Sequence, residues 1–418
     1  DNGLYMPSNF PKLDKIWLSQ LSTYSFKEIA YKIAYDLIGS EIPSDDLQKI
    51  IEDTITFPAP IVQLYDNIYI QELWHGPSMA FKDFGARFMA GLMSYFNQGE
   101  QKELNILVAT SGDTGGAVAA GFYKTPGINV IILYPKGKVS PIQESQLTTL
   151  GENIYAIAVE GDFDDCQRLV KQAFLDESLK SIINLSSANS INIARLIPQS
   201  FYYFEGVKQL IHKEHITYVV PSGNLGNLTA GVLAQRMGAP IESFIAATNS
   251  NQTIPNYLKT GEYEPKHTVK TIANAMDVSR PSNFERLKDL FKGNSDGSTW
   301  NNIKNIISSE YLKDEEILKT IQEVYDQTNY ILDPHTAIGV KIAQENLPLS
   351  PQKNYIILGT AHFGKFLEVI KDAIPNEKLE LPKRLQLNNN PVKNTVTQSN
   401  QYEEFKNYLL KHVSRETN

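Results

Sequence analysis

The chain has 418 residues, of which 42% are hydrophobic and 21% are charged. This composition is ordinary for a globular protein, and the length favours two or three domains. The net charge of −8 argues against a basic surface, so we expect no nucleic-acid partner. With one cysteine, Cys166, no signal-peptide pattern and no apolar run of spanning length, we expect a cytoplasmic protein with no membrane partner.

Residues 12–52 predict a helical segment, because Ile29, Ile33 and Leu37 recur at helical spacing. Short β-rich runs then alternate with helical patterns, which predicts βαβ units and a mostly parallel sheet. The runs expected to be buried strands are 104–109, 130–134, 154–159, 217–220, 243–248 and 355–358.

The order of these elements predicts a smaller α/β unit inserted in a larger one. We expect an N-terminal helical segment at 1–60, a large α/β domain built from 61–100 and 203–385, and a small α/β domain at 101–202. The remainder, 386–418, reads as a solvated, loosely held tail that ends in an amphipathic helix at 402–413.

A single lysine, Lys82, lies among aromatic and small apolar residues in the run 75–88, just after a Gly-Pro break. Burial lowers the pKa of an ammonium group and makes the amine nucleophilic, as a Schiff base with an aldehyde cofactor requires. A helix that begins near Ser78 would lower this pKa further through its dipole. Gly85 and Ala86, one turn later, would leave room for a flat ring. The alternative is a solvated lysine on an amphipathic helix.

Three segments share one layout, in which a buried strand, a small polar loop and a helix follow one another: 107–117, 219–230 and 357–365. Ligands of open α/β sheets bind at the carboxyl ends of strands, and Gly-rich turns into helices present N–H groups to anions. Three such corners favour a ligand with more than one polar end, although each turn alone could be structural. The motif of Gly223 and Gly226 is not that of a dinucleotide or nucleoside-triphosphate site.

Other motifs favour structural roles. His212 and His215 lie at a charged helix end without the ligand spacing of a metal site, so we expect no metal. The G-x-S-x-G match at 293–297 follows a charged helical pattern and predicts a surface turn, because a nucleophile elbow follows a buried strand. Cys166 is expected to pack in the core.

The run 75–88 resembles the cofactor-lysine motif of the threonine synthase family, pyridoxal-phosphate enzymes of the tryptophan-synthase-β-like fold. Further segments resemble that family in its order: 2–7, SGDTG at 111–115, NSINIAR at 189–195, PSGNLGN at 221–227, AMDVSRPSNFE at 275–285, LDPHTA at 332–337 and TAH at 360–362. The resemblance covers residue 2 to about residue 370. It implies an α/β protein of fold type II, with two open, mostly parallel sheets, flanking helices and cofactor bound by the large domain.

The resemblance implies roles for the matched residues toward pyridoxal 5'-phosphate. Lys82 would be the catalytic residue and would form the Schiff base. Thr360 would place its hydroxyl at the pyridine nitrogen, and Asp113 stands where relatives of the fold often carry an Asn that faces the ring hydroxyl. The cofactor phosphate would be held through backbone N–H groups of Ser222, Gly223, Asn224, Leu225, Gly226 and Asn227.

The implied substrate is O-phospho-L-homoserine, which would be converted with water into L-threonine and phosphate by elimination and hydration. Arg195 offers a planar, permanently charged fork for the substrate phosphate. The family positions that would assist are Thr110, Ser111, Thr114, Asn189 and Ser190. Lys138 is a weaker candidate, for which an exposed turn is the alternative. We expect a monomer or a homodimer.

The chain departs from the family pattern after His362, where Phe363 and Gly364 replace a common Pro-Ala pair. This changes the shape near the ring without removing a reactive group, and His362 is expected to support the cofactor pocket. The residues without an assigned role, expected to anchor loops near the site, are Asp277, Ser279, Arg280 and Ser282.

Two other functions stay open at this point. A serine or threonine dehydratase of the same fold would use Lys82 but would not need the phosphate-binding set around Arg195. A non-catalytic binding protein related to this family would not need the nucleophile, so the intact Lys82 argues against it.

Overall fold

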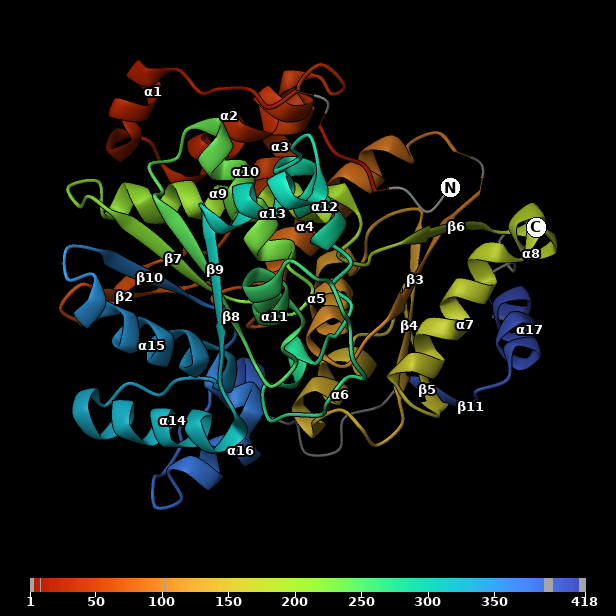
Figure 1. Ribbon diagram of the computed structural model, residues 1–418. Coiled ribbons are helices and arrows are strands. Elements are labelled where there is room, and N and C mark those ends of the chain that lie inside the picture. The colour runs from red at the N-terminus through yellow and green to blue at the C-terminus, as the bar shows by residue number, and fades with distance from the viewer. Residues whose placement is uncertain (1–3, 8, 101, 387–393, 413–418) are drawn as a thin grey trace. The chain divides into compact units, whose positions relative to one another are not determined.

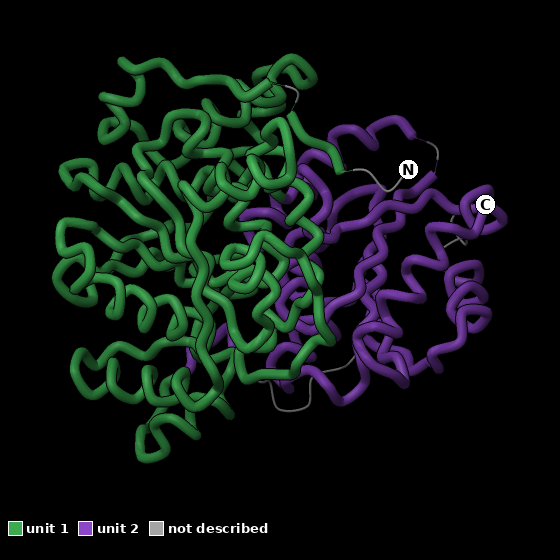
Figure 2. Tube along the Cα trace, viewed as in Figure 1, with its two compact units in different colours: residues 1–81, 196–380 green, residues 82–195, 381–418 purple. Residues whose placement is uncertain are grey.

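The computed structural model describes residues 4–7, 9–100, 102–386 and 394–412. The chain divides into two compact units, which Figure 2 distinguishes by colour. Unit 1 comprises residues 1–81 and 196–380, and unit 2 comprises residues 82–195 and 381–418. Each unit is built around its own sheet with helices on its faces, so the chain belongs to the α/β class with two sheets, as predicted.

The first helices of unit 1 confirm the predicted N-terminal helical segment. They are α1 (Lys15–Ser19), α2 (Phe26–Ile38) and α3 (Ser44–Thr54). A capping box starts α2: the Ser25 hydroxyl accepts from the Glu28 N–H, and the Glu28 carboxylate accepts from the Ser25 N–H. Ile29 and Ile33 form the buried stripe of α2, as their spacing predicts.

The sheet of unit 1 has the strand order β1-β2-β10-β7-β8-β9. Only the edge pair β1 and β2 is antiparallel, and the other neighbours are parallel. The strands are β1 (Ile61–Tyr65), β2 (Ile68–Glu72), β7 (Ile216–Pro221), β8 (Ser243–Thr248), β9 (Ile307–Tyr311) and β10 (Asn354–Gly359). Every residue of the central strands β7 and β10 is buried, as expected for a parallel sheet with both faces covered.

The remaining helices of unit 1 lie between or after its strands in the chain. Of these, α15 packs directly on β7 and β10 (Figure 1). They are α9 (Ile193–Gln209), α10 (Gly226–Met237), α11 (Thr253–Thr260), α12 (Phe284–Leu290), α13 (Asp296–Lys304), α14 (Asp314–Thr328), α15 (Pro334–Asn346) and α16 (Leu367–Ala373). The first three residues of α9 are grouped with unit 2.

The sheet of unit 2 is parallel throughout, with the order β11-β5-β4-β3-β6. Its strands are β3 (Leu104–Ala109), β4 (Ile128–Pro135), β5 (Ile154–Glu160), β6 (Asn184–Ser187) and β11 (Thr395–Ser399). Alternate side chains enter opposite cores: Ile106 and Val108 lie in one core, and Leu107 and Ala109 in the other.

Helices cover both faces of this second sheet (Figure 1). Side chains of α4 (Lys82–Phe96), α5 (Asp113–Phe122) and α6 (Pro141–Thr148) pack in the first core. Side chains of α7 (Phe163–Leu175), α8 (Glu177–Ile182) and α17 (Tyr402–His412) pack in the second.

All six predicted strands are present, with ends that agree within two residues. The sequence did not predict β1, β2, β6, β9 or β11. Of these strands, β6 and β11 are short, polar sheet edges, NLSS and TVTQS, and such edges lack the continuous apolar run that marks a buried strand. Within the described ranges, no helix combines the length and apolar character needed to cross a membrane.

The observed units differ from the predicted domain boundaries at several places. Residues 196–202, which we placed in the small domain, are grouped with unit 1, and residues 381–385, which we placed in the large domain, are grouped with unit 2. Helix α4 is grouped with unit 2, although we placed 61–100 in the large domain. The described part of the predicted tail, 394–412, is not loosely held: β11 pairs with β5, and Phe405 and Leu409 are fully buried in the second core of unit 2. Residues 387–393 lie outside the described ranges.

Because α17 supplies core residues, the C-terminal segment should contribute to the stability of unit 2. Phe405→Ala removes a fully buried ring, and we expect it to lower the free energy of unfolding by about 3–5 kcal/mol. The exposed Lys411→Ala on the same helix should change it by less than about 0.5 kcal/mol. Urea unfolding of both variants measures this difference, and equal small effects would show that α17 is dispensable.

Candidate functional site

Two of the three predicted corners lie at one edge of the sheet in unit 1. Strands β7 and β10 are parallel neighbours, with Ile357 opposite Val219. Their carboxyl ends therefore reach the same edge, where the loop 222–225 follows β7 and Thr360 follows β10. The structure thus brings together the residues predicted to hold the two ends of the cofactor.

The loop after β7, which we call the anion loop (222–227), presents backbone donors. Leu225 has a left-handed backbone with φ of 61° and precedes the first residue of α10, Gly226. Within the described part of the chain, no acceptor is present for the backbone N–H groups of Gly223, Leu225, Gly226 and Asn227. Successive N–H groups at a helix N-terminus form an anion site, so this loop has the donors that a phosphate needs.

The side chains of the anion loop serve its shape. The Ser222 hydroxyl donates to the Val220 carbonyl at 2.7 Å, and the Asn227 amide donates to the Pro221 carbonyl at 2.9 Å. Gly223 must lack a side chain, because a Cβ there would lie 2.8 Å from the Cα of Met276. These side chains therefore hold the backbone of the loop, and binding of an anion by its backbone N–H groups stays a prediction.

Residues without a predicted role anchor this region. The Ser282 N–H donates to the Asn224 side-chain oxygen, which ties the anion loop to the segment before α12. Asp277 accepts from the side chains of Asn249 and Thr271, while burial raises the pKa of its carboxyl to about 6. The Ser279 carbonyl accepts from Thr253, and Arg280 is exposed.

The corner after β10 is joined to the segment that leads to Lys82. Ala80 and Ala361 form an antiparallel bridge, in which the Phe81 N–H donates to the Thr360 carbonyl at 2.9 Å. The buried Lys365 ammonium donates to the Ser78 carbonyl at 2.9 Å. These bonds hold the residue that precedes Lys82 in register with Thr360.

Thr360 is the residue whose hydroxyl is predicted to lie at the pyridine nitrogen. The side chain is buried, with 7% of its surface exposed, but its hydroxyl forms no hydrogen bond with any described residue. The hydroxyl is therefore available to a ligand.

Lys82 is the first residue of α4, which begins four residues later than we expected. The preceding segment is a turn, in which Met79 has a left-handed backbone with φ of 56°. Lys82 therefore lies at the positive end of the helix dipole, as predicted.

The small residues after Lys82 have a different role from the one we predicted. A Cβ at Gly85 would lie 3.0 Å from the Arg195 carbonyl oxygen and 3.5 Å from its Nε, so this position is filled by Arg195. Ala86 packs against Gly121 of α5. The small side chains permit close packing of α4 and do not leave room for a ring.

The predicted substrate-binding residues lie at one edge of unit 2. Strands β3 and β6 are parallel neighbours, with Leu107 opposite Ser187. The structure therefore places two groups at the same carboxyl edge: one contains Thr110, Ser111, Asp113 and Thr114, and the other contains Asn189, Ser190 and Arg195.

Arg195 is the main cation of this edge. It is 3% exposed, and burial lowers the pKa of its guanidinium to about 10, so it stays charged at neutral pH. Its Nη1 donates to the Ala188 carbonyl at 2.7 Å, which fixes the fork. The Lys138 side chain, in contrast, is exposed, as its alternative interpretation predicts.

The neighbouring side chains hold the loop before α5. The Thr110 hydroxyl oxygen accepts from the N–H groups of Gly112 and Gly115 at 3.0 Å and 2.8 Å. The Asp113 carboxylate accepts from the Gln143 amide at 3.0 Å. Gly112 has φ of 138° and faces the Gln143 side chain, so a side chain at position 112 would be strained.

Sequence reasoning missed Gln143, Lys365 and His335. Gln143 forms a capping box with Ser140, which predicts a helix start, but its bond to Asp113 gives no local signal because the two are 30 residues apart. Lys365 is a lone lysine among aromatic and small residues, which is the pattern that identified Lys82. His335 lies inside the LDPHTA motif, where an Asp N-cap and a Pro predict the start of a helix.

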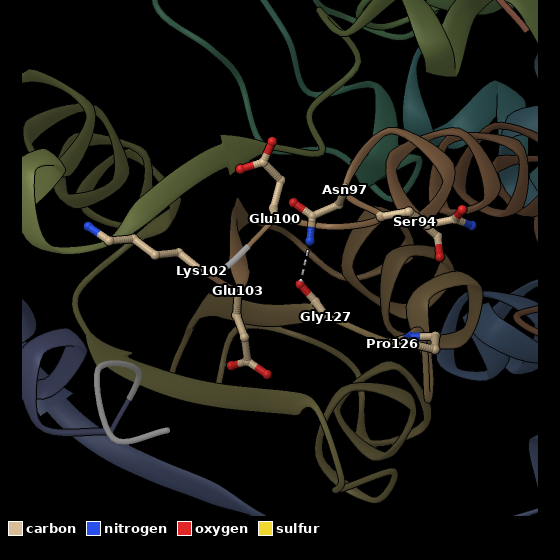
Figure 3. A pocket seen from close by; sticks show the side chains of 8 residues that line it. Ser94, Asn97, Glu100, Lys102, Glu103, Pro126 and Gly127 are labelled. Atoms are coloured by element: carbon tan, nitrogen blue, oxygen red, sulfur yellow. Dashed lines mark hydrogen bonds between the residues drawn. The ribbon is translucent and has the colours of Figure 1, made fainter. Parts of the chain in front are cut away.

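The other candidates have structural settings. Cys166 is buried, which raises the pKa of its thiol to about 12. Among the residues that the structure describes, no three His, Cys, Asp or Glu side chains are grouped to hold a metal ion. A hollow of about 290 Å³ lies beside Asn97, Lys102 and Gly127, at the amino-terminal side of β3 and β4 (Figure 3). It contains none of the predicted site residues.

Models of known families match the chain along its length. The family described as pyridoxal-phosphate dependent enzyme matches residues 48–360. The family described as threonine synthase N terminus matches residues 1–55, and that described as threonine synthase, C-terminal, matches residues 336–409.

Individual relatives agree with the family models. Threonine synthase of Haemophilus influenzae is 45% identical over 413 residues, covering 98% of this chain and 94% of its own. The solved threonine synthase of Escherichia coli aligns with a TM-score of 0.89 at 40% identity, covering 98% and 94%. The threonine synthase of Brucella melitensis, solved with PLP bound, aligns with a TM-score of 0.91 at 34% identity, covering 99% and 94%.

His362 should make stability depend on pH. Its Nδ1 accepts from the Gly364 N–H at 3.0 Å, and burial lowers the pKa of the ring from 6.5 to about 4. Between these pH values the unfolded chain binds a proton that the folded chain excludes, so stability falls as pH decreases from 6.5 to about 4. His362→Asn keeps an acceptor at this helix start but cannot titrate.

As pH decreases from 6.5 to about 4, the free energy of unfolding of the parent protein should fall by on the order of 2 kcal/mol more than that of His362→Asn. Urea unfolding at several pH values between 4 and 7 measures this difference for both proteins. Identical pH dependence would contradict the assignment.

Proposed function

The chain belongs to the threonine synthase family, and we propose that it converts O-phospho-L-homoserine and water into L-threonine and phosphate, the last step of threonine biosynthesis. The observation that carries this proposal is identity above 40% to a threonine synthase over nearly the whole chain, together with the presence of Lys82, Arg195 and Thr360 within the matched motifs. The enzyme is a carbon–oxygen lyase that uses pyridoxal 5'-phosphate.

The cofactor residues would come from the edge of unit 1 and from Lys82. The anion loop would hold the cofactor phosphate through backbone N–H groups, and Thr360 would donate its hydroxyl to the ring nitrogen or accept from it. When bound, the cofactor supplies an electron sink that stabilises negative charge on the substrate carbon atoms. A neutral hydroxyl at the ring nitrogen would make this sink weaker than a carboxylate would.

Lys82 would control the protons of the reaction. Once the substrate amine has displaced it, the Lys82 amine would take a proton from Cα, release it, and then take a second proton from Cβ, so that phosphate leaves from Cγ. One proton then returns to Cγ, water adds at Cβ, and a second proton returns to Cα, with Lys82 as the proton donor. Its place at the first turn of α4 favours the neutral amine that these steps need.

Arg195 would bind the substrate phosphate through its guanidinium fork. The hydroxyl and amide groups of Thr110, Ser111, Thr114, Asn189 and Ser190 would complete this site. Because the guanidinium keeps its charge when the phosphate departs, Arg195 would hold the leaving group and help it to activate the water.

We further propose that the enzyme acts in the cytoplasm, as a monomer or a homodimer, without nucleic-acid or membrane partners. The net charge of −8 and the single, buried cysteine support this setting.

Lys82→Ala should abolish both the visible absorption of bound cofactor and the release of phosphate from O-phosphohomoserine. The exposed Lys27→Ala should retain both. A colorimetric phosphate assay and an absorption spectrum measure these results. Ammonia release from threonine without phosphate release from O-phosphohomoserine would identify a dehydratase, and an unchanged spectrum in Lys82→Ala would disprove the lysine assignment.

Arg195→Ala should lower kcat/KM for O-phosphohomoserine by at least about 100-fold, because a buried charge partner of the phosphate is lost. Arg195→Lys keeps the charge but loses the fork, so its kcat/KM should lie between those of the parent protein and Arg195→Ala. Both variants should keep the visible cofactor spectrum. If the spectrum is lost as well, Arg195 serves the cofactor or the fold.

A further inference from the structure

A buried pair of side chains, Asp333 and His335, lies beside the anion loop at the start of α15. Both are 2% exposed. Asp333 is the N-cap of α15, where its carboxylate accepts from the backbone N–H of His335 at 3.0 Å and from the Thr336 hydroxyl. His335 Nδ1 lies 2.8 Å from the same carboxylate. A buried carboxylate with this many donors is stable and well oriented.

The second ring nitrogen of His335 reaches another segment. Its Nε2 lies 3.2 Å from the backbone nitrogen of Ala275, whose N–H donates to it. An N–H group can only donate, so Nε2 carries no proton, and the proton lies on Nδ1 and points to Asp333. Asp333 therefore selects the tautomer that allows His335 to bind Ala275.

The bond to Ala275 acts on the anion loop through a close backbone contact. Ala275 and Met276 belong to a short 3-10 helix, and a Cβ at Gly223 would lie 2.8 Å from the Met276 Cα and 3.2 Å from the Ala275 carbonyl oxygen. Segment 274–276 thus forms the wall against which the backbone of the anion loop rests. The Phe366 ring packs against the His335 imidazole in an edge-to-face arrangement, with 4.8 Å between the ring centroids.

We infer that Asp333 and His335 are positioning residues that fix segment 274–276 against Gly223 and so set the geometry of the anion loop for a phosphate group. This inference rests on the proposed function, in which the loop holds the phosphate of pyridoxal 5'-phosphate. Neither side chain touches the ligand in this role. They act through the tautomer of His335 and its bond to Ala275.

Two substitutions of His335 separate its two bonds. His335→Gln places an acceptor near Nε2, so it keeps the bond to Ala275. His335→Asn places an amide near Nδ1, so it keeps the bond to Asp333 and loses the bond to Ala275. Both variants remove volume from the same buried position, and His335→Asn removes one methylene more than His335→Gln. The comparison of two compounds in the binding test separates this general packing loss from an effect on the phosphate.

The test compares binding of pyridoxal 5'-phosphate and of pyridoxal, which lacks the phosphate, to apoprotein, followed by visible absorption. We expect His335→Asn to weaken pyridoxal 5'-phosphate binding about tenfold or more and to leave pyridoxal binding unchanged. His335→Gln should stay within about threefold of the parent protein for both compounds. Equal losses for the two compounds, or equal behaviour of the two variants, would overturn the inference.

The tautomer gives a second test, which does not depend on the binding assay. In a ¹⁵N spectrum of the histidine rings, His335 should show a protonated Nδ1 and an unprotonated Nε2; the chain has seven histidines, and the signal absent from His335→Gln identifies it. The opposite tautomer would overturn the inference. Failure of the parent protein to bind pyridoxal 5'-phosphate at all would instead contradict the proposed function.

Discussion

The site of unit 1 depends on the backbone bridge between Ala80 and Ala361. Through this bridge, the segment that leads to Lys82 takes its position from the corner after β10 and does not depend on a flexible loop. Beside the bridge, Met79 has a left-handed backbone, which is unfavourable for a residue with a side chain. The hydrogen bonds of Met79 and Ser78 to His362 and Lys365 offset this cost. Such bonds hold a strained turn in one conformation.

Each unit builds its site by the same rule. Parallel neighbours end at one edge, so loops that are far apart in the chain converge there. Gly223 follows β7 and Thr360 follows β10 in unit 1, while Thr110 follows β3 and Asn189 lies beyond β6 in unit 2. The choice of residues at these edges can then vary while the sheet stays the same, which is why parallel α/β sheets support many chemistries.

The sequence predicted the parts of the fold that carry a local signal. Apolar runs located all six expected strands, and strand-loop-helix motifs located the three corners. It did not predict β11, whose TVTQS sequence is polar and which is stabilised by pairing with β5. It also predicted room for a flat ring beside Gly85, because the partner that fills this position, Arg195, is more than 100 residues away. Contacts of long sequence separation, such as that between Gln143 and Asp113, leave no local pattern.

To bind phosphate groups, a protein of net charge −8 must create positive potential locally. In the proposed function, the two edges would do so in different ways. The anion loop would use backbone N–H groups and a helix N-terminus, which cost no side-chain ordering and suit a phosphate that stays bound. The edge of unit 2 would use a buried guanidinium, whose full charge would hold the phosphate as it leaves and gains negative charge. Burial makes this charge stronger toward a phosphate, because little solvent screens it, and costly in its absence, which favours occupancy of the site by an anion.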